Sequence, residues 1–375
     1  MNGKRNFGLD LLRAGAIAGV FLAHGVTALE SLGIGVYLFF VLSGFLIGRI
    51  YFRWSRAGHF NIGKFWIERW WRTLPPYLAA LGLFALAERW IPSNPVNWRY
   101  LLFLQNFTGI AGFGPSWSLC VEEHFYLLLP LLALMAERLF GRKQFNWLLP
   151  AAFLTPTLFR LAAIVRVGGV VNMPREWYRM TPFHCDGLIA GVYLAFLFVE
   201  HPDWFASARR PALCCAPLVV VSVLATPLLK GGVWFESLHS AVEALGFAGW
   251  LRLAYDFSWT PLTLAGRLSE KAIRGMALVS YSIYLLHVLV MTDLHVLLNA
   301  WPRGTGKSLF ILGTTLMVCV AFYFLVEKPS IWSRDRFLHR REPLVHRLPQ
   351  PTPISPWTRR RRDADEGLQS GATGA

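Results

Sequence analysis

The chain has 375 residues, of which 54% are hydrophobic and 16% are charged, whereas soluble domains carry about 25% charged residues. The apolar residues fall in blocks of roughly 17 to 22, the length that crosses a bilayer. Composition therefore excludes a soluble globular domain and predicts an all-α, polytopic integral membrane protein. The net charge of +15 does not indicate a nucleic-acid partner, because the basic residues gather in alternate connections and in the tail.

Ten membrane-spanning helices are expected. They are residues 9–28, 34–51, 74–91, 120–139, 146–165, 183–199, 212–229, 234–253, 277–298 and 308–326. An even number of spans puts both termini on one side, and 27 of the 37 Lys and Arg residues then lie on that side, against eight on the other. The positive-inside bias predicts that both termini are cytoplasmic. The first span lacks an A-x-A-like cleavage site, and we expect it to be retained as a signal-anchor.

The first span places an arginine and a histidine in an apolar helix. Arg13 and His24 are eleven residues apart, close to three helical turns, so both project from one face roughly 16 Å apart. Ionisable groups inside a membrane usually face a functional interior, and this pair offers a fixed cation and a titratable base. The alternative is that Arg13 snorkels to the lipid headgroups and His24 anchors the opposite end of the helix.

The connection before the third span is the densest basic loop. Within it the segment RWWR places Arg69 and Arg72 three residues apart, on one face if the segment is helical. A loop that only obeys the positive-inside bias would look much the same. Pro75 and Pro76 follow, and we expect them to break the helix and redirect the chain into the third span.

Later spans carry further polar residues. Glu122 and Glu123 open the fourth span, where adjacent helical residues point about 100° apart, so one of them at most faces a shared cavity. His184 and Asp186 stand at the start of the sixth span, a position more typical of helix capping than of catalysis. His287 is embedded among apolar residues in the ninth span, where a packing role is expected.

Two other kinds of site are not expected. The five cysteines form no C-x-x-C pair and have no histidine at ligand spacing, so we predict neither a zinc site nor a disulfide framework. The segment WPRGTGKS lacks the first glycine of a phosphate-binding loop, because Trp301 occupies that position. No metal cofactor follows from the sequence.

Six segments in order resemble the acyltransferase 3 family of integral-membrane acyltransferases, which includes O-acetyltransferases of O-antigen and exopolysaccharide. They are the Arg13 to His24 spacing, GVYLFFVLSGFLIGRI, RWWRTLPPY, SWSLCVEEHFYLLLPLL, VSYSIYLLH and FYFLVEKPSIW. The resemblance spans roughly residues 7–333, which we take as the membrane-embedded domain, and residues 334–375 then form a basic tail expected to be disordered. Cys120, His124 and His184 depart from the family pattern.

The resemblance implies transfer of an acyl group, most often acetyl, from acyl-CoA to a hydroxyl of a glycan, glycolipid or macrolide on the outer side of the bacterial cytoplasmic membrane. His24 would be the general base, and Glu122 or Glu123 would orient it or bind sugar hydroxyls. Arg69 and Arg72 would bind the CoA phosphates, with Arg13 binding CoA or lining its path. Many relatives append an exported SGNH esterase-like domain, which we do not expect here.

Two other classes stay open at this point. A transporter or flippase also keeps charges inside its helices, although no internal repeat is visible in the sequence. A membrane sensor or scaffold would tolerate substitution of Arg13 and His24. A homo-oligomer is compatible with the sequence, which does not identify the acceptor.

Overall fold

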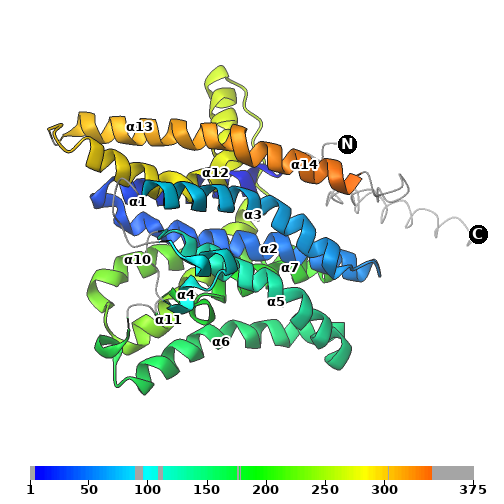
Figure 1. The fold of residues 1–375 in the computed structure, drawn as a ribbon. Helices are drawn as coiled ribbons and strands as arrows, with labels where there is room; N and C mark the ends of the chain where they lie inside the picture. Colours follow the sequence, from blue (N-terminus) through cyan, green and yellow to red (C-terminus); the bar gives the residue numbers. More distant parts are fainter. Residues whose placement is uncertain are drawn as a thin grey trace, which may run out of the picture. The chain divides into compact units, whose positions relative to one another are not determined.

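The computed structural model describes residues 5–88, 96–108, 113–174, 177, 179–302 and 304–339. Its contacts divide the chain into two units, Met1–Ile331 and Trp332–Ala375. Every regular element of the described residues is a helix, which confirms the all-α prediction (Figure 1). The predicted disordered tail lies almost entirely outside the described residues.

Each expected span corresponds to a long helix, although the helices at 62–87 and 264–297 begin 12 and 13 residues before the expected starts at 74 and 277. The long helices are α1 (Phe7–Gly25), α2 (Gly35–Arg56), α3 (Ile62–Ala87), α5 (Ser116–Phe140), α6 (Phe145–Arg166), α7 (Asp186–Glu200), α10 (Leu218–Leu229), α11 (Val233–Tyr255), α12 (Leu264–Leu297) and α13 (Thr305–Phe322). Short helices connect them: η1 (Thr27–Ile34), η2 (Trp98–Leu102), α4 (Gln105–Thr108), η3 (Arg142–Gln144), η4 (Val170–Asn172), η6 (Thr181–Phe183), α8 (Pro202–Ser207) and α9 (Arg209–Cys215). A π-helical turn, η7 (Tyr323–Glu327), leads into α14 (Lys328–His339).

Seven helical segments of the described chain are long and apolar enough to cross a membrane, which confirms the polytopic class. They are Phe7–Gly25, Ala28–Arg56, Ser116–Phe140, Arg142–Arg166, Arg209–Leu229, Leu264–Leu297 and Thr305–Phe337. The other three predicted spans correspond to α3, α7 and α11. Helix α7 has only 15 residues, fewer than the roughly 20 that a span needs, and α11 carries Glu236, Glu243 and Arg252. Ten spans therefore stay a prediction.

Helix α3 corrects the prediction that Pro75 and Pro76 would interrupt it. It runs unbroken through both prolines. A proline inside a helix leaves the carbonyl four residues earlier without its helical donor, and for Pro75 that carbonyl belongs to Trp71. The hydroxyl of Ser330 donates to Trp71 O at 2.9 Å. A partner from a distant part of the chain thus replaces the hydrogen bond that Pro75 removes.

Helices α2 and α7 pack in parallel at backbone contact, through glycines four residues apart on each helix. A Cβ atom on Gly44 would lie 2.0 Å from Leu188 O, and one on Gly191 would lie 2.1 Å from Val41 O. Small residues at this spacing let membrane helices approach closely. Their packing sets the position of α2, which contributes side chains to both ends of the bundle.

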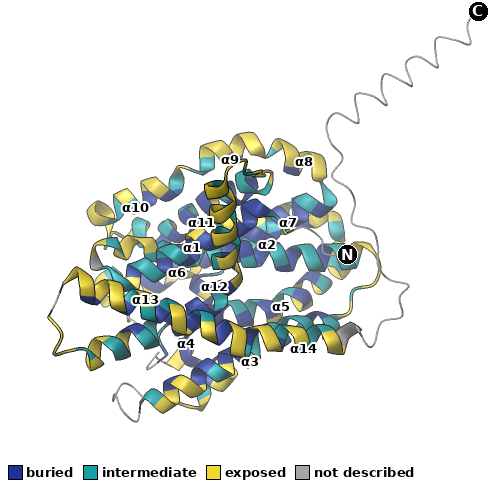
Figure 2. Cartoon of the chain, turned by 90° about the horizontal axis from the view of Figure 1, so that it is seen from above, coloured by how far each residue is buried: buried dark blue, intermediate teal, exposed yellow. Residues whose placement is uncertain are grey.

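The burial pattern fits a membrane protein whose centre is formed by α1, α2 and α7 (Figure 2). The outer helices α5, α6, α10 and α13 expose apolar side chains, for example Leu158 at 61% and Leu224 at 68%. Contiguous apolar surface of this kind is expected where lipid is the solvent.

The two ends of the bundle differ in charge. Helices α1 and α2 run antiparallel through η1, so the start of α1 and the end of α2 lie together. We call this the basic end, after Arg5, Arg49, Arg53 and Arg56. His24 lies at the other end of α1, which we call the histidine end.

Candidate active site

His24 lies in the last turn of α1 and contacts a second histidine from α12. Its Nδ1 atom is 2.9 Å from Val20 O and 3.4 Å from Nε2 of His287. The two rings meet edge to face, with centroids 4.8 Å apart. The sequence singled out both residues but did not predict that they meet.

The hydrogen bonds of this pair determine where the protons lie. His287 is fully buried, and its Nδ1 is 2.9 Å from Ile283 O and 3.0 Å from Tyr284 O, two groups that only accept. His287 Nδ1 therefore carries the proton, and its Nε2 is an acceptor. By the same reasoning His24 donates from Nδ1, to Val20 O and toward His287 Nε2. This leaves His24 Nε2 unprotonated, as a general base requires.

Arg13 lies closer to the basic end, where α3 adds two more arginines. It is half-buried and makes no hydrogen bond or ion pair with a described residue. Arg69 and Arg72 are its main electrostatic neighbours, and both repel it. Three guanidinium groups of like charge are thus held near one another, an arrangement that favours a polyanionic ligand.

The glutamates of α5 face α3 rather than His24. Glu122 accepts hydrogen bonds from Ser43 Oγ at 3.1 Å and from the Tyr126 hydroxyl, and it lies 3.8 Å from Arg69. Arg69 also donates to the Tyr126 hydroxyl. Glu123 is 8% exposed and has Arg69 as its main charged neighbour. Neither glutamate hydrogen-bonds to His24 within the described chain.

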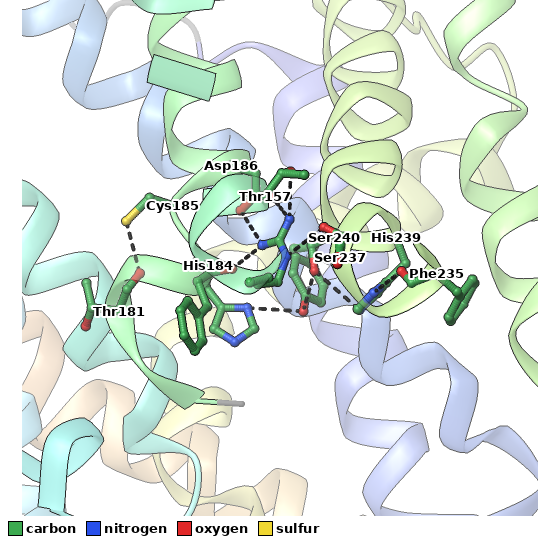
Figure 3. A network of polar contacts seen from close by, with 12 residues as sticks. Thr157, Thr181, His184, Cys185, Asp186, Phe235, Ser237, His239 and Ser240 are labelled. Atoms are coloured by element: carbon green, nitrogen blue, oxygen red, sulfur yellow. Dashed lines mark hydrogen bonds and ion pairs between the residues drawn. The ribbon is translucent and has the colours of Figure 1, made fainter. Parts of the chain in front are cut away.

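A further polar cluster, at the histidine end, joins α6, α7 and α11 (Figure 3). Arg160 of α6 donates to both carboxylate oxygens of Asp186, at 2.7 and 3.2 Å, and both side chains are almost fully buried. The guanidinium also donates to Thr157 Oγ1, Ser237 O and Phe183 O. Since all five of its N–H groups have acceptors, the cluster ties three helices together and has no donor left for a ligand.

The same cluster shows how the Asp186 carboxylate obtains a cationic partner, although the residue two positions before it is His184. Arg160 supplies the cation from a different helix. His184 instead lies 3.3 Å from the Tyr37 hydroxyl and packs edge-on against Trp117, with ring centroids 5.0 Å apart. Asp186 is the first residue of α7, but no side chain caps this helix start, and its carboxylate pairs with Arg160, so the capping interpretation is not confirmed.

Comparison with known proteins decides the family. A family model described as an acyltransferase domain matches residues 6–326, most of the chain. The chain belongs to the acyltransferase 3 family. No solved structure matches it.

Curated relatives of this acyltransferase 3 protein include O-acetyltransferases. The peptidoglycan O-acetyltransferase OatA of Listeria monocytogenes is 22% identical over 357 residues, which cover 86% of this chain and 55% of the relative. The O-acetyltransferase OatA of Staphylococcus aureus is 26% identical over 217 residues, 51% of this chain and 34% of the relative. The acyltransferase MdmB of Streptomyces mycarofaciens is 37% identical over 127 residues, 30% of each chain. The chain thus spans about half the length of the Listeria relative and a third of the other two.

Within this acyltransferase 3 fold, the structure brings the predicted site residues into two groups. His24 lies with His287, whereas Arg13, Arg69, Arg72, Glu122 and Glu123 lie together closer to the basic end. Sequence reasoning missed Tyr126 and Ser43 as partners of Glu122. The i, i+4 spacing of Glu122 and Tyr126 on one helix was a usable signal for the first of these. No sequence signal pointed to Ser43, which comes from α2.

Proposed function

We propose that the protein transfers an acetyl group from acetyl-CoA to a hydroxyl group of a glycan or glycosylated acceptor on the outer side of a bacterial cytoplasmic membrane. Family membership supports acyl transfer, and the names of the OatA relatives support O-acetylation. The observation that carries the proposal is the His24–His287 pair, because it leaves one imidazole nitrogen ready to accept a proton.

The reaction needs one base and one leaving group. The acceptor hydroxyl gives its proton to His24 Nε2 as its oxygen bonds to the thioester carbonyl carbon. The carbon–sulfur bond then breaks, and the CoA thiolate leaves and recovers the proton from His24. His287 Nε2, which accepts from His24 Nδ1, holds the ring in the reactive tautomer and stabilises the imidazolium form. General-base assistance of this kind is typically worth 10² to 10⁴ in rate.

The arginines suit the donor side of the reaction. In this proposal the basic end faces the cytoplasm, where acyl-CoA is found, and both termini lie there. Arg13 and the Arg69–Arg72 pair bind the phosphates, since guanidinium groups match phosphate oxygens in charge and geometry. Glu122 then positions Arg69 through Tyr126, and Glu123 adds a second negative charge beside the same arginine.

Purified protein tests this function with acetyl-CoA labelled in the acetyl group and a soluble oligosaccharide acceptor. Wild-type protein should release CoA and form the labelled ester, and His24→Ala should lower the rate by about 10² to 10⁴. A folded His24→Ala protein with full transfer activity would refute the base assignment. A wild-type protein that neither binds nor cleaves acetyl-CoA, but moves a polar substrate across vesicles, would instead be a transporter.

A further inference from the structure

A second arginine site lies at the basic end, on the side of α2 that faces α7 and α11. The Arg49 guanidinium carbon is 5.4 Å from the ring centre of Phe45, 4.8 Å from that of Phe198 and 5.9 Å from that of Tyr255. Rings at these distances attract the cation and hold the side chain in one position. None of the proposed donor-binding residues belongs to this group.

The Arg49 guanidinium has no acceptor in the described chain. Its Nε atom is buried without a hydrogen-bond partner, and its other nitrogens make no ion pair or hydrogen bond with a described residue. Asp256, the carboxylate next to Tyr255, forms its ion pair with Arg252, at 2.6 Å, and not with Arg49. A guanidinium that is fixed in place but lacks an anion is prepared for one from outside the described protein.

A second cation, Arg53, lies beside the Arg49 guanidinium. One helical turn along α2, the Arg53 guanidinium carbon lies 5.6 Å from the same Phe198 ring, and it too makes no hydrogen bond to a described residue. Arg56, a turn further, differs because it donates to Val199 O at 2.6 Å. The free pair of cations is therefore Arg49 and Arg53.

The position of this arginine pair along the bundle can be compared with that of Arg13. Gly35 of α2 lies opposite Ala16 and Val20 of the antiparallel α1. With a helical rise of 1.5 Å per residue, Arg49 then lies roughly 13 Å nearer the basic end than Arg13. Along the bundle the order is His24, Arg13 and Arg49.

We propose that Arg49, assisted by Arg53, binds the 3′-phosphate at the nucleotide end of acyl-CoA. This inference rests on the proposed function. CoA is a linear molecule with the thioester at one end, a diphosphate in the middle and the 3′-phosphate on the terminal ribose, and it matches the order His24, Arg13, Arg49. The aromatic rings keep the guanidinium in position, so little conformational freedom is lost when phosphate binds. An anionic lipid headgroup offers the same phosphate chemistry, and the test separates the two sources.

The test measures binding of acetyl-CoA and of its 3′-dephospho analogue to the full chain in nanodiscs of neutral phosphatidylcholine. Wild-type protein should bind acetyl-CoA about tenfold or more tightly than the analogue, as expected for one charge-assisted contact. Arg49→Gln should bind both with the weaker affinity. Arg210→Gln is the matched control, because Arg210 is an exposed arginine on α9, and it should preserve the difference.

Each other outcome overturns the inference in a recognisable way. If wild-type protein binds acetyl-CoA and its 3′-dephospho analogue equally, Arg49 does not bind the 3′-phosphate, while the proposed function stands. If, in addition, phosphatidylglycerol stabilises the wild-type protein but not the Arg49→Gln protein, the ligand of Arg49 is a lipid headgroup. If wild-type protein does not bind acetyl-CoA at all, the proposed function fails as well. Arg49→Lys keeps the charge without the planar fork and should retain part of the discrimination, which controls for misfolding of the glutamine variant.

Discussion

The contact between His24 and His287 shows how neighbouring groups, rather than residue type alone, set which imidazole nitrogen of a proposed base is unprotonated. Backbone carbonyls of α12 fix the proton of His287 on Nδ1, and this makes Nε2 an acceptor for His24. Outer partners of this kind orient an imidazole and set which nitrogen is free. In the sequence the two histidines are 263 residues apart, and only packing of α1 on α12 brings them together.

Removing His287, the hydrogen-bond acceptor of His24, should therefore lower turnover without changing the binding of acetyl-CoA. His287→Phe keeps a ring in the buried site but cannot accept from His24, so we expect kcat to fall about tenfold or more with KM for acetyl-CoA unchanged. His287→Gln, which restores an acceptor, should recover part of the rate. Steady-state kinetics with labelled acetyl-CoA give both constants.

The control for this prediction is on the same helix. His295→Phe changes an exposed histidine of α12 that has no contact with His24, and it should behave as wild type. Equal losses in the His287→Phe and His295→Phe proteins, or a KM effect alone, would contradict the positioning role.

At the scale of elements, helix contacts decide what local patterns leave open. Two prolines in α3 favour a break, yet the helix continues, and Ser330 replaces the hydrogen bond that Pro75 removes. The glycines of α2 and α7 allow backbone contact that larger residues would prevent. In both cases the partner comes from a distant part of the chain.

The α2–α7 contact can be tested with one methyl group. In Gly191→Ala the new Cβ would lie 2.1 Å from Val41 O, so the helices must separate, and overpacking of this kind costs about 1 to 3 kcal/mol. Thermal unfolding in detergent should show a clearly lower midpoint. Gly313→Ala is the matched control, because its Cβ would meet nothing within 4 Å. An unchanged midpoint for Gly191→Ala would show that this contact is looser than the structure indicates.

For the whole molecule, the separation of charge and chemistry along the bundle is the central feature. Arg13, Arg49 and Arg53 lie toward the basic end, and the histidine pair lies at the other. If the basic end faces the cytoplasm, a donor and an acceptor can approach from opposite sides of the membrane. The direction of the helices is thus part of the proposed mechanism.

Cysteine labelling tests this direction. In a background without the five native cysteines, Lys230→Cys should react with a membrane-impermeant maleimide in intact cells, because it joins α10 to α11 at the histidine end. Arg56→Cys, at the basic end, should react only after the cells are lysed. The positive-inside bias is the physical reason for this expectation. The reverse labelling pattern would place the arginines outside and would contradict cytoplasmic donor entry.

Much of the fold could be predicted from the sequence, because each apolar block must form its own backbone hydrogen bonds in lipid. The all-α class and the approximate helix positions followed from composition and spacing alone. The six segments that resemble the family were also readable, and the match over residues 6–326 confirms the family.

What tertiary structure alone decided were contacts between helices distant in the chain. The partner of His24, the pairing of Asp186 with Arg160 and the aromatic surroundings of Arg49 each join residues from different helices. Periodicity shows which face of one helix is polar, but it does not show which neighbour that face meets. The physical reason is that helix pairing depends on side-chain fit across the whole bundle, as at Gly44 and Gly191, and no single segment encodes it.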